Sequence, residues 1–149
     1  MPEYRNILFC TDFSHNADVA FEEAAYIASL AGARLTLLHV VHAGVGEAAR
    51  ALPADQVAAE DDAGLERMAR EYPSPAGVEM SYSVRHGNIA AEILEEAQEV
   101  GAELIVIGAR GLTRWEAFMG GGSIAEKVVR HASTTVVVVP AREPAGDAQ

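Results

Sequence analysis

Five short runs of β-forming apolar residues alternate with segments of helical spacing along this 149-residue chain. The runs are RNILFC (5–10), RLTLLHVV (34–41), VEMSYSVR (78–85), ELIVIG (103–108) and TTVVVVP (134–140). The helical segments lie between them, at 16–32, 54–72, 88–101 and 123–132. Strands that alternate with helices of this length form βαβ units with right-handed crossovers. The sequence therefore predicts an α/β fold with a five-stranded, mostly parallel sheet that has helices on both faces.

The apolar pattern also predicts where strands lie in the sheet. The first, second and fourth runs are apolar throughout their centres, which is typical of strands buried on both faces. The third run alternates apolar and polar residues, which indicates an edge strand. No linker or internal repeat interrupts the pattern, so we expect a single domain over residues 1–141. The tail, 142–149, follows the last strand and is expected to be disordered.

The charge and the hydropathy pattern exclude several classes of partner. The net charge is −11 and the chain has one lysine, Lys127, so we expect no nucleic acid partner. No apolar run approaches the roughly 20 residues that a membrane-spanning helix needs, so we expect no membrane insertion. The first residues lead directly into a strand pattern without a leader segment, which favours the cytoplasm.

Polar residues that follow the strands are the candidates for a ligand site, because open α/β sheets bind ligands at the carboxyl ends of their strands. Asp12 follows the first strand, where its carboxylate could accept hydrogen bonds from a ribose hydroxyl or an adenine amine. The alternative is structural: Asp12 or Ser14 caps the helix that follows.

Two glycine-rich elements bracket the segment after the fourth strand. Gly108 and Gly111 flank two residues directly after that strand, and glycines there allow backbone N–H groups to converge on an anion. Gly122 and Ser123 open the last helix, whose N-terminus also favours phosphate. Ser123 is equally well placed to cap that helix, with Glu126 three residues on. The sequence contains neither a Walker P-loop nor a G-x-G-x-x-G motif after the first strand.

Taken together, these segments resemble the universal stress proteins over almost the whole chain. ILFCTDFS resembles the family's opening strand, and LTLLHVV its second strand. HGNIAAEILEEAQEVGAELIVIGARG resembles its central block, and GGSIAEKVVRHASTTVVVVP its closing helix and strand. The resemblance implies a sheet with strand order 3-2-1-4-5, an adenosine-nucleotide-binding fold and a regulatory or stress-response role.

The resemblance also implies the ligand and its contacts. The ligand would be ATP, or ADP or AMP, possibly with Mg²⁺. Asp12 would contact the adenosine moiety, Val40 would contact adenine through its backbone, and Ile107 would line the base pocket. The residues that would contact the ribose and phosphates are Gly108, Gly111, Gly121, Gly122, Ser123 and Ile124. Two cations, Arg110 and Arg114, lie in the same segment and could screen phosphate charge or be solvated.

One position departs from the motif of the family's ATP-binding members, G-x2-G-x9-G-[ST]. Nine residues after Gly111 lead to Gly121, but Gly122 follows where the motif has Ser or Thr. The pair Gly122-Ser123, which has the required serine, is reached only with ten intervening residues after Gly111. The departure affects the phosphate contacts and leaves the adenosine contacts unchanged. The alternative is a member of the family that binds no nucleotide and acts as a dimeric interaction module.

The last strand suggests how the chain assembles. TTVVVV would expose an apolar edge, which pairing with a second copy would bury. Because the family dimerises in this way, we expect a homodimer through Thr135 to Val139. We expect no metal site and no catalytic residues, since the five histidines lack metal-binding spacing and no nucleophile–base arrangement is evident; ATP hydrolysis would be slow at most.

Overall fold

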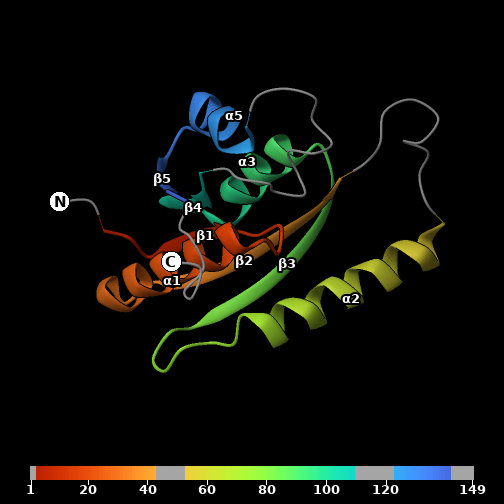
Figure 1. The fold of residues 1–149 in the computed structure, drawn as a ribbon, viewed down its shortest axis with the longest axis horizontal. Helices are drawn as coiled ribbons and strands as arrows, with labels where there is room; N and C mark the ends of the chain where they lie inside the picture. Colours follow the sequence, from red (N-terminus) through yellow and green to blue (C-terminus); the bar gives the residue numbers. More distant parts are fainter. Residues whose placement is uncertain (1–2, 43–52, 110–122, 142–149) are drawn as a thin grey trace, which may run out of the picture.

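A sheet of five parallel strands organises the protein, as seen in the computed structural model (Figure 1). The structure describes residues 3–42, 53–109 and 123–141. The strands are β1 (Asn6–Cys10), β2 (Arg34–His42), β3 (Met80–Gly87), β4 (Leu104–Gly108) and β5 (Thr135–Val139). They lie in the order β3-β2-β1-β4-β5, and every neighbouring pair is parallel. The predicted α/β class and strand order are confirmed. The expected tail, 142–149, lies outside the described residues.

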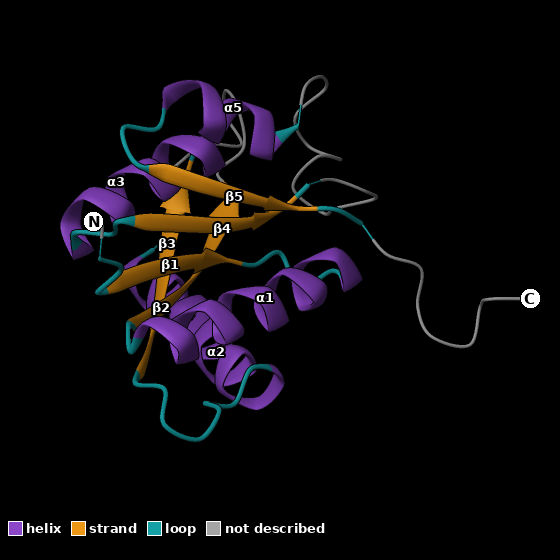
Figure 2. Ribbon diagram, turned by 90° about the vertical axis from the view of Figure 1, so that its left-hand side faces the viewer, coloured by secondary structure: helices purple, strands orange, loops and turns teal. Residues whose placement is uncertain are grey.

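Helices cover both faces of the sheet, as predicted. They are α1 (His15–Ala31), α2 (Ala54–Glu71), α3 (Ile89–Val100) and α5 (Ile124–His131). Figure 2 shows α1 and α2 on one side of the sheet and α3 and α5 on the other. Three of the four helices begin at a side-chain cap, namely Ser14, Asn88 and Ser123. Gly32 ends α1 with a φ of 64°, the left-handed conformation that glycine adopts at little cost.

Strand β3 differs from its predicted bounds by two residues. The sequence pattern suggested 78–85, whereas β3 spans Met80–Gly87. The N–H of Val78 donates instead to the carbonyl of Pro75, 3.1 Å away, in the turn that precedes the strand. β3 then follows β2 to its end, where Gly87 pairs with His42. Its position at the edge of the sheet agrees with the prediction.

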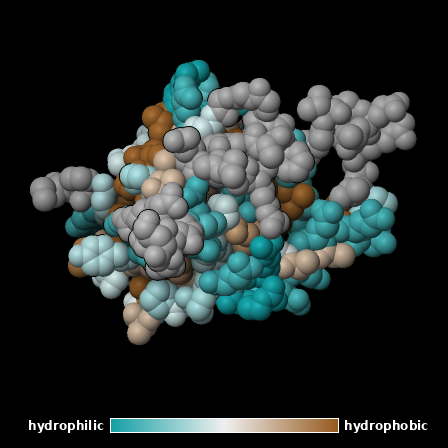
Figure 3. Space-filling view, viewed as in Figure 1, coloured by the Kyte–Doolittle hydropathy of each residue, from teal (hydrophilic) through white to brown (hydrophobic). Residues whose placement is uncertain are grey.

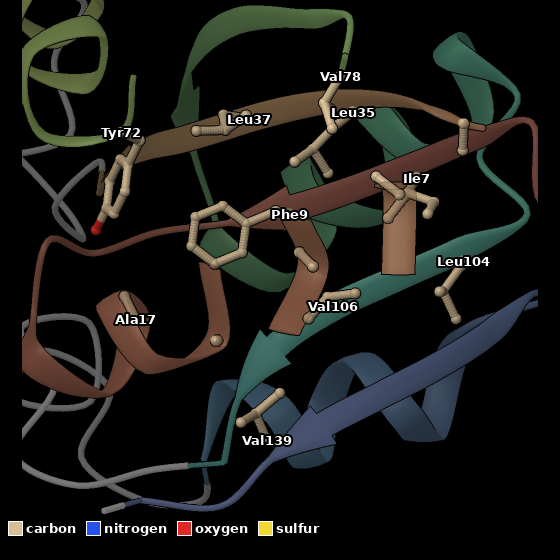
Figure 4. Close-up of a cluster of buried hydrophobic side chains, with 14 of the residues drawn as sticks. Ile7, Phe9, Ala17, Leu35, Leu37, Tyr72, Val78, Leu104, Val106 and Val139 are labelled. Carbon is tan, nitrogen blue, oxygen red and sulfur yellow. The ribbon is translucent and has the colours of Figure 1, made fainter. Parts of the chain in front are cut away.

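Two buried clusters fill the space between the sheet and its helices. The first includes Phe9 and Leu37 and packs against α1 and α2; Figure 4 shows part of it. The second includes Leu38 and packs against α3 and α5. Consecutive residues of one strand therefore serve opposite layers, which explains why the central strands are apolar at every position. The outer surface of α2 is largely hydrophilic (Figure 3).

The length and polarity of the helices in the described ranges decide whether any of them could cross a bilayer. Within these ranges, each helix is too short or too polar to span a membrane.

The two layers predict matched losses of stability. Leu37→Ala and Leu38→Ala each remove a side chain that is 0% exposed, one from each cluster. Each change should lower the free energy of unfolding by about 2–5 kcal/mol in urea denaturation, because a cavity remains. Leu30→Ala, at a position that is 71% exposed, is the control and should stay within about 0.5 kcal/mol of the wild type. Equal losses in all three variants would contradict the assigned layers.

Candidate functional site

A tight turn at the carboxyl end of β1 holds Asp12. The N–H of Thr11 still donates to the carbonyl of Leu38 on β2, at 2.9 Å, so the turn begins inside the sheet. The Asp12 side chain is 3% exposed, and its Oδ1 accepts a hydrogen bond from the N–H of Ser14 at 3.0 Å. Ser14 is the N-cap of α1, accepting from the N–H of Ala17 at 3.3 Å. Of the two capping candidates, Ser14 therefore caps the helix, and Asp12 orders the turn.

Gly108 lies at the carboxyl end of β4, close to the first turn of α1. A Cβ atom at this position would lie 3.2 Å from the carbonyl oxygen of Asn16. The next N–H, of Ala109, donates to the carbonyl of Val139 at 2.8 Å. The φ of Gly108 is not positive, so close packing, rather than an unusual backbone conformation, explains the glycine at this position.

Val40, Ile107 and Ile124 come together in the second buried cluster, between the sheet and α3 and α5. Their exposed fractions are 1%, 3% and 2% respectively. The structure thus brings together three predicted site residues from two strands and one helix. Because the Val40 side chain is in the core, any contact it makes with a ligand would come from its backbone, as the resemblance implies.

Ser123 occupies the N-cap of α5. Its Oγ accepts a hydrogen bond from the N–H of Glu126 at 2.9 Å, so the capping interpretation of Ser123 is confirmed. The Glu126 carboxylate accepts from Arg130 at 3.1 Å. A capping hydroxyl can also contact an anion, so the cap does not exclude a phosphate role. The other predicted residues of this segment lie outside the described residues: Arg110, Gly111, Arg114, Gly121 and Gly122.

A chain of hydrogen bonds below Asp12 was not foreseen from the sequence. The Tyr72 hydroxyl donates to Oδ1 of Asp18 at 2.7 Å and lies 2.7 Å from Oγ1 of Thr11. Because the single Tyr72 proton goes to Asp18, Thr11 must donate to Tyr72. Thr11 Oγ1 in turn accepts from the N–H of Phe13 at 2.9 Å. The chain therefore runs in one direction, from the turn to α1. Sequence reasoning missed Tyr72 because it lies 61 residues from Thr11.

Burial shifts the pKa of several groups around this turn. It raises the pKa of Asp18, and the hydrogen bond from Tyr72 opposes the shift in part. It also raises the pKa of the Tyr72 hydroxyl and of the Cys10 thiol, so both stay protonated at neutral pH. A buried, protonated Cys10 is a small core residue rather than a nucleophile.

His39, on β2, supports the same turn from the other side. Its Nδ1 lies 2.9 Å from the carbonyl oxygen of Thr11. Since a carbonyl only accepts, Nδ1 carries the proton and donates it. Burial lowers the pKa of His39, and its hydrogen bond to Thr11 partly offsets the shift. His39 is therefore a partly buried histidine whose Nδ1 has a hydrogen-bond partner.

The described residues contain no group of three or more His, Cys, Asp and Glu side chains arranged to hold a metal ion. The arrangement at the carboxyl ends of β1 and β4 is instead suited to a neutral polar group. A buried carboxylate lies there beside a close-packed glycine, and the capped N-terminus of α5 follows. Such a site can accept hydrogen bonds from hydroxyl or amine groups and favour an anion at the helix terminus.

Comparison with known proteins gives one consistent result. A family model described as "Universal stress protein family" matches residues 3–140. A putative universal stress protein of Staphylococcus epidermidis is 33% identical over 153 residues, which cover 100% of this chain and 92% of that protein.

Solved structures agree with the sequence comparison. The universal stress protein UspA from Lactobacillus plantarum is 31% identical, with a TM-score of 0.68, and the match covers 93% of this chain and 99% of that one. A universal stress protein from Archaeoglobus fulgidus, solved in complex with dAMP, has the same fold at 23% identity. Its TM-score is 0.59, and the match covers 93% of this chain and 99% of that one.

The lowered pKa of His39 predicts a pH-dependent stability. Because the unfolded chain binds a proton at His39 more readily than the folded protein, the free energy of unfolding should fall as the pH drops through 6.5, the ordinary pKa. His39→Gln keeps a donor for Thr11 and removes the titration, so its stability should depend less on pH between about 7.5 and 5.5. Urea denaturation at each pH measures this.

The exposed His131 provides the control. His131→Gln should retain the pH dependence of the wild type. If His39→Gln also retained it in full, the lowered pKa of His39 would be wrong.

Proposed function

The chain belongs to the universal stress protein family, and we propose that it binds an adenosine nucleotide as a regulatory or stress-response protein of the cytoplasm. One observation carries the proposal: the Asp12 carboxylate is buried at the carboxyl end of β1, next to the strand that ends at Gly108. In the order β3-β2-β1-β4-β5, the chain reverses direction across the sheet between β1 and β4. Ligands of open α/β sheets bind at this reversal.

The adenosine end of the ligand would lie against the regular part of the fold. Asp12 would accept hydrogen bonds from the O–H groups of the ribose or the N–H groups of the adenine amine. The Val40 backbone and Ile107 would border the base, as the resemblance implies. The complex of the Archaeoglobus fulgidus protein with dAMP supports an adenine nucleotide as the ligand class.

The phosphate end would lie at the N-terminus of α5. Ser123 and Ile124 would bind phosphate through backbone N–H groups and the Ser123 hydroxyl, since a helix N-terminus favours anions. Gly111, Gly121 and Gly122 would complete the contacts, and Arg110 and Arg114 would screen the charge. We propose ATP as the preferred ligand, with ADP and AMP as weaker ones and Mg²⁺ as the counterion. Binding, rather than fast hydrolysis, is the proposed activity.

We also propose a homodimer through β5. This strand is at the edge of the sheet, paired on one side with β4. Its Val138 is 38% exposed. Antiparallel pairing of two β5 strands around a two-fold axis would satisfy the free edge and cover Val138.

The alternative is a dimeric interaction module that binds no nucleotide. The additional glycine at Gly122 is the feature that favours it. Calorimetric titration with Mg·ATP and with AMP separates the two proposals. Binding of AMP alone would place the defect in the phosphate contacts, whereas binding of neither ligand at millimolar concentration would favour the interaction module.

Asp12→Asn tests the adenosine contact. Asparagine keeps an oxygen for the N–H of Ser14 but loses the charge that strengthens hydrogen bonds to the ligand. The Kd for ATP should rise about 10- to 100-fold in calorimetry, with little change in the melting temperature. Asp55→Asn, at an exposed position of α2, removes the same charge and should bind as the wild type does. Equal affinities of both variants would remove Asp12 from the site.

Val138→Lys tests the dimer. A charge on the β5 edge should prevent close pairing of two copies, so sedimentation at micromolar concentration should change from dimer to monomer. Leu30→Lys, on the exposed side of α1, is the control and should remain dimeric. A monomeric wild type would contradict the proposal.

A further inference from the structure

Phe13, the residue after Asp12, has an unusual backbone conformation. Its φ is 64°, and it is the only non-glycine residue with a positive φ in the described part of the chain. This region is sparsely populated for residues with a bulky side chain. Such a conformation persists where the surrounding structure holds it, and it is often found at functional sites.

Three side chains from outside the turn hold the Phe13 ring. His39 lies with its ring centroid 4.6 Å away, and Tyr72 stacks at 6.2 Å with an angle of 15°. The guanidinium carbon of Arg67 lies 4.0 Å from the ring centroid, in a cation–π contact. We call these four residues the Phe13 cluster. Arg67 lies in α2, and Tyr72 is the C-cap residue that follows its last turn.

The same helix also holds Thr11, the residue before Asp12. The Tyr72 hydroxyl accepts a hydrogen bond from Thr11 Oγ1, which lies 2.7 Å away. Asp12 is therefore bracketed: one neighbour in the chain is held by a hydrogen bond and the other by ring and cation–π contacts. Tyr72, the C-cap of α2, supplies the hydrogen bond and one ring contact, and Arg67 of α2 supplies the cation–π contact; the other ring contact comes from His39 of β2.

Helix α2 is largely exposed, and its other contacts reach the core through Leu65 and β3 through a hydrogen bond of 2.6 Å between Asp61 and His86. Within the helix only Met68 is fully buried, and Tyr72 follows directly after its last residue. Figure 4 shows Tyr72 beside Phe9, with its hydroxyl at the margin of the core. The carboxyl-terminal half of α2 is thus attached in part through Arg67 and Tyr72, which also contact the Asp12 turn.

We propose that Arg67 and Tyr72 are positioning residues that hold the Asp12 carboxylate in the orientation that binds the adenosine moiety. This inference rests on the proposed nucleotide site and adds a regulatory element to it. Coupling between sites is reciprocal, so a nucleotide bound at Asp12 must strengthen the attachment of α2 by the same factor. The docking of α2 and the occupancy of the site are then linked.

Calorimetry with ATP tests the role of Arg67. Arg67→Met should raise the Kd about three- to tenfold, because the cation over Phe13 is lost while most of the side-chain length remains. Arg70→Met removes the same charge three residues away, at an exposed position, and should leave the Kd unchanged. Equal Kd values for the two variants would overturn the proposal.

A double-mutant cycle with Phe13→Gly tests the route of the effect. Glycine adopts a φ of 64° without strain and removes the ring. Arg67→Met should then have no further effect on the Kd. If Arg67→Met weakened binding by the same factor in both backgrounds, Arg67 would not act through Phe13.

Hydrogen exchange separates this proposal from the proposed function, because it needs no nucleotide. The N–H groups of Phe13 and Ser14 donate to Thr11 Oγ1 and Asp12 Oδ1. Tyr72→Phe should accelerate their exchange about fivefold and leave the amides of β4 unchanged. Unchanged exchange at both amides would overturn the positioning role, even if nucleotide binds. If Tyr72→Phe accelerated the exchange of these amides but the wild type bound no nucleotide, the result would support the positioning role and contradict the proposed function.

With nucleotide bound, amides in the carboxyl-terminal half of α2 should exchange more slowly than in the free protein. A residue with a purely structural role would not produce this response. No slowing at α2, in a protein that binds ATP, would contradict the coupling.

Discussion

The burial of the end of β1 is the constraint on which the rest of the structure depends. β1 pairs with β2 and β4, and its residues serve both core layers, so its last residues leave the sheet in a region closed to water. Thr11 and Asp12 are 0% and 3% exposed, and burying such groups is costly unless they are hydrogen-bonded. The chain of bonds from Phe13 through Thr11 and Tyr72 to Asp18 provides partners for Thr11, and the N–H of Ser14 provides one for Asp12. It also determines how the turn carries Asp12.

That solution explains why the turn combines a polar sequence with a strained conformation. The carbonyl of Thr11 accepts from His39, its hydroxyl donates to Tyr72, and the Asp12 carboxylate accepts from the next turn of the chain. These bonds hold the residues on either side of Phe13, whose backbone lies in the left-handed region. The aromatic and cation–π contacts around Phe13 offset part of the cost. The site therefore stores strain next to the residue expected to meet the ligand.

Much of this fold could be predicted from the sequence, because local patterns determine it. Continuous apolar runs identify buried parallel strands, and Ser14, Gly32 and Ser123 mark helix ends by their own chemistry. The order of the strands needed the family resemblance, since periodicity does not specify neighbours. Tyr72 and Arg67 could not be predicted: their partners are far away in sequence, and a helical pattern gives no information on which turn its last residues contact. The left-handed backbone conformation of Phe13 is one that a bulky side chain rarely adopts, so it follows from tertiary contacts and could not be predicted from the sequence.

The two halves of the proposed site differ in how the chain builds them. The adenosine half consists of strand ends and the first turn of α1, where a Cβ atom on Gly108 would lie 3.2 Å from the carbonyl oxygen of Asn16, a tight contact. The described part of the phosphate half is the N-terminus of α5, where Ser123 already caps the helix. A ligand at Ser123 therefore has to share a hydroxyl that the helix uses, whereas a ligand at Asp12 meets a carboxylate held by the core. The nucleoside contacts should accordingly contribute more to the affinity than the phosphate contacts, which still favour ATP over ADP and AMP, and the additional glycine beside Ser123 affects the phosphate half.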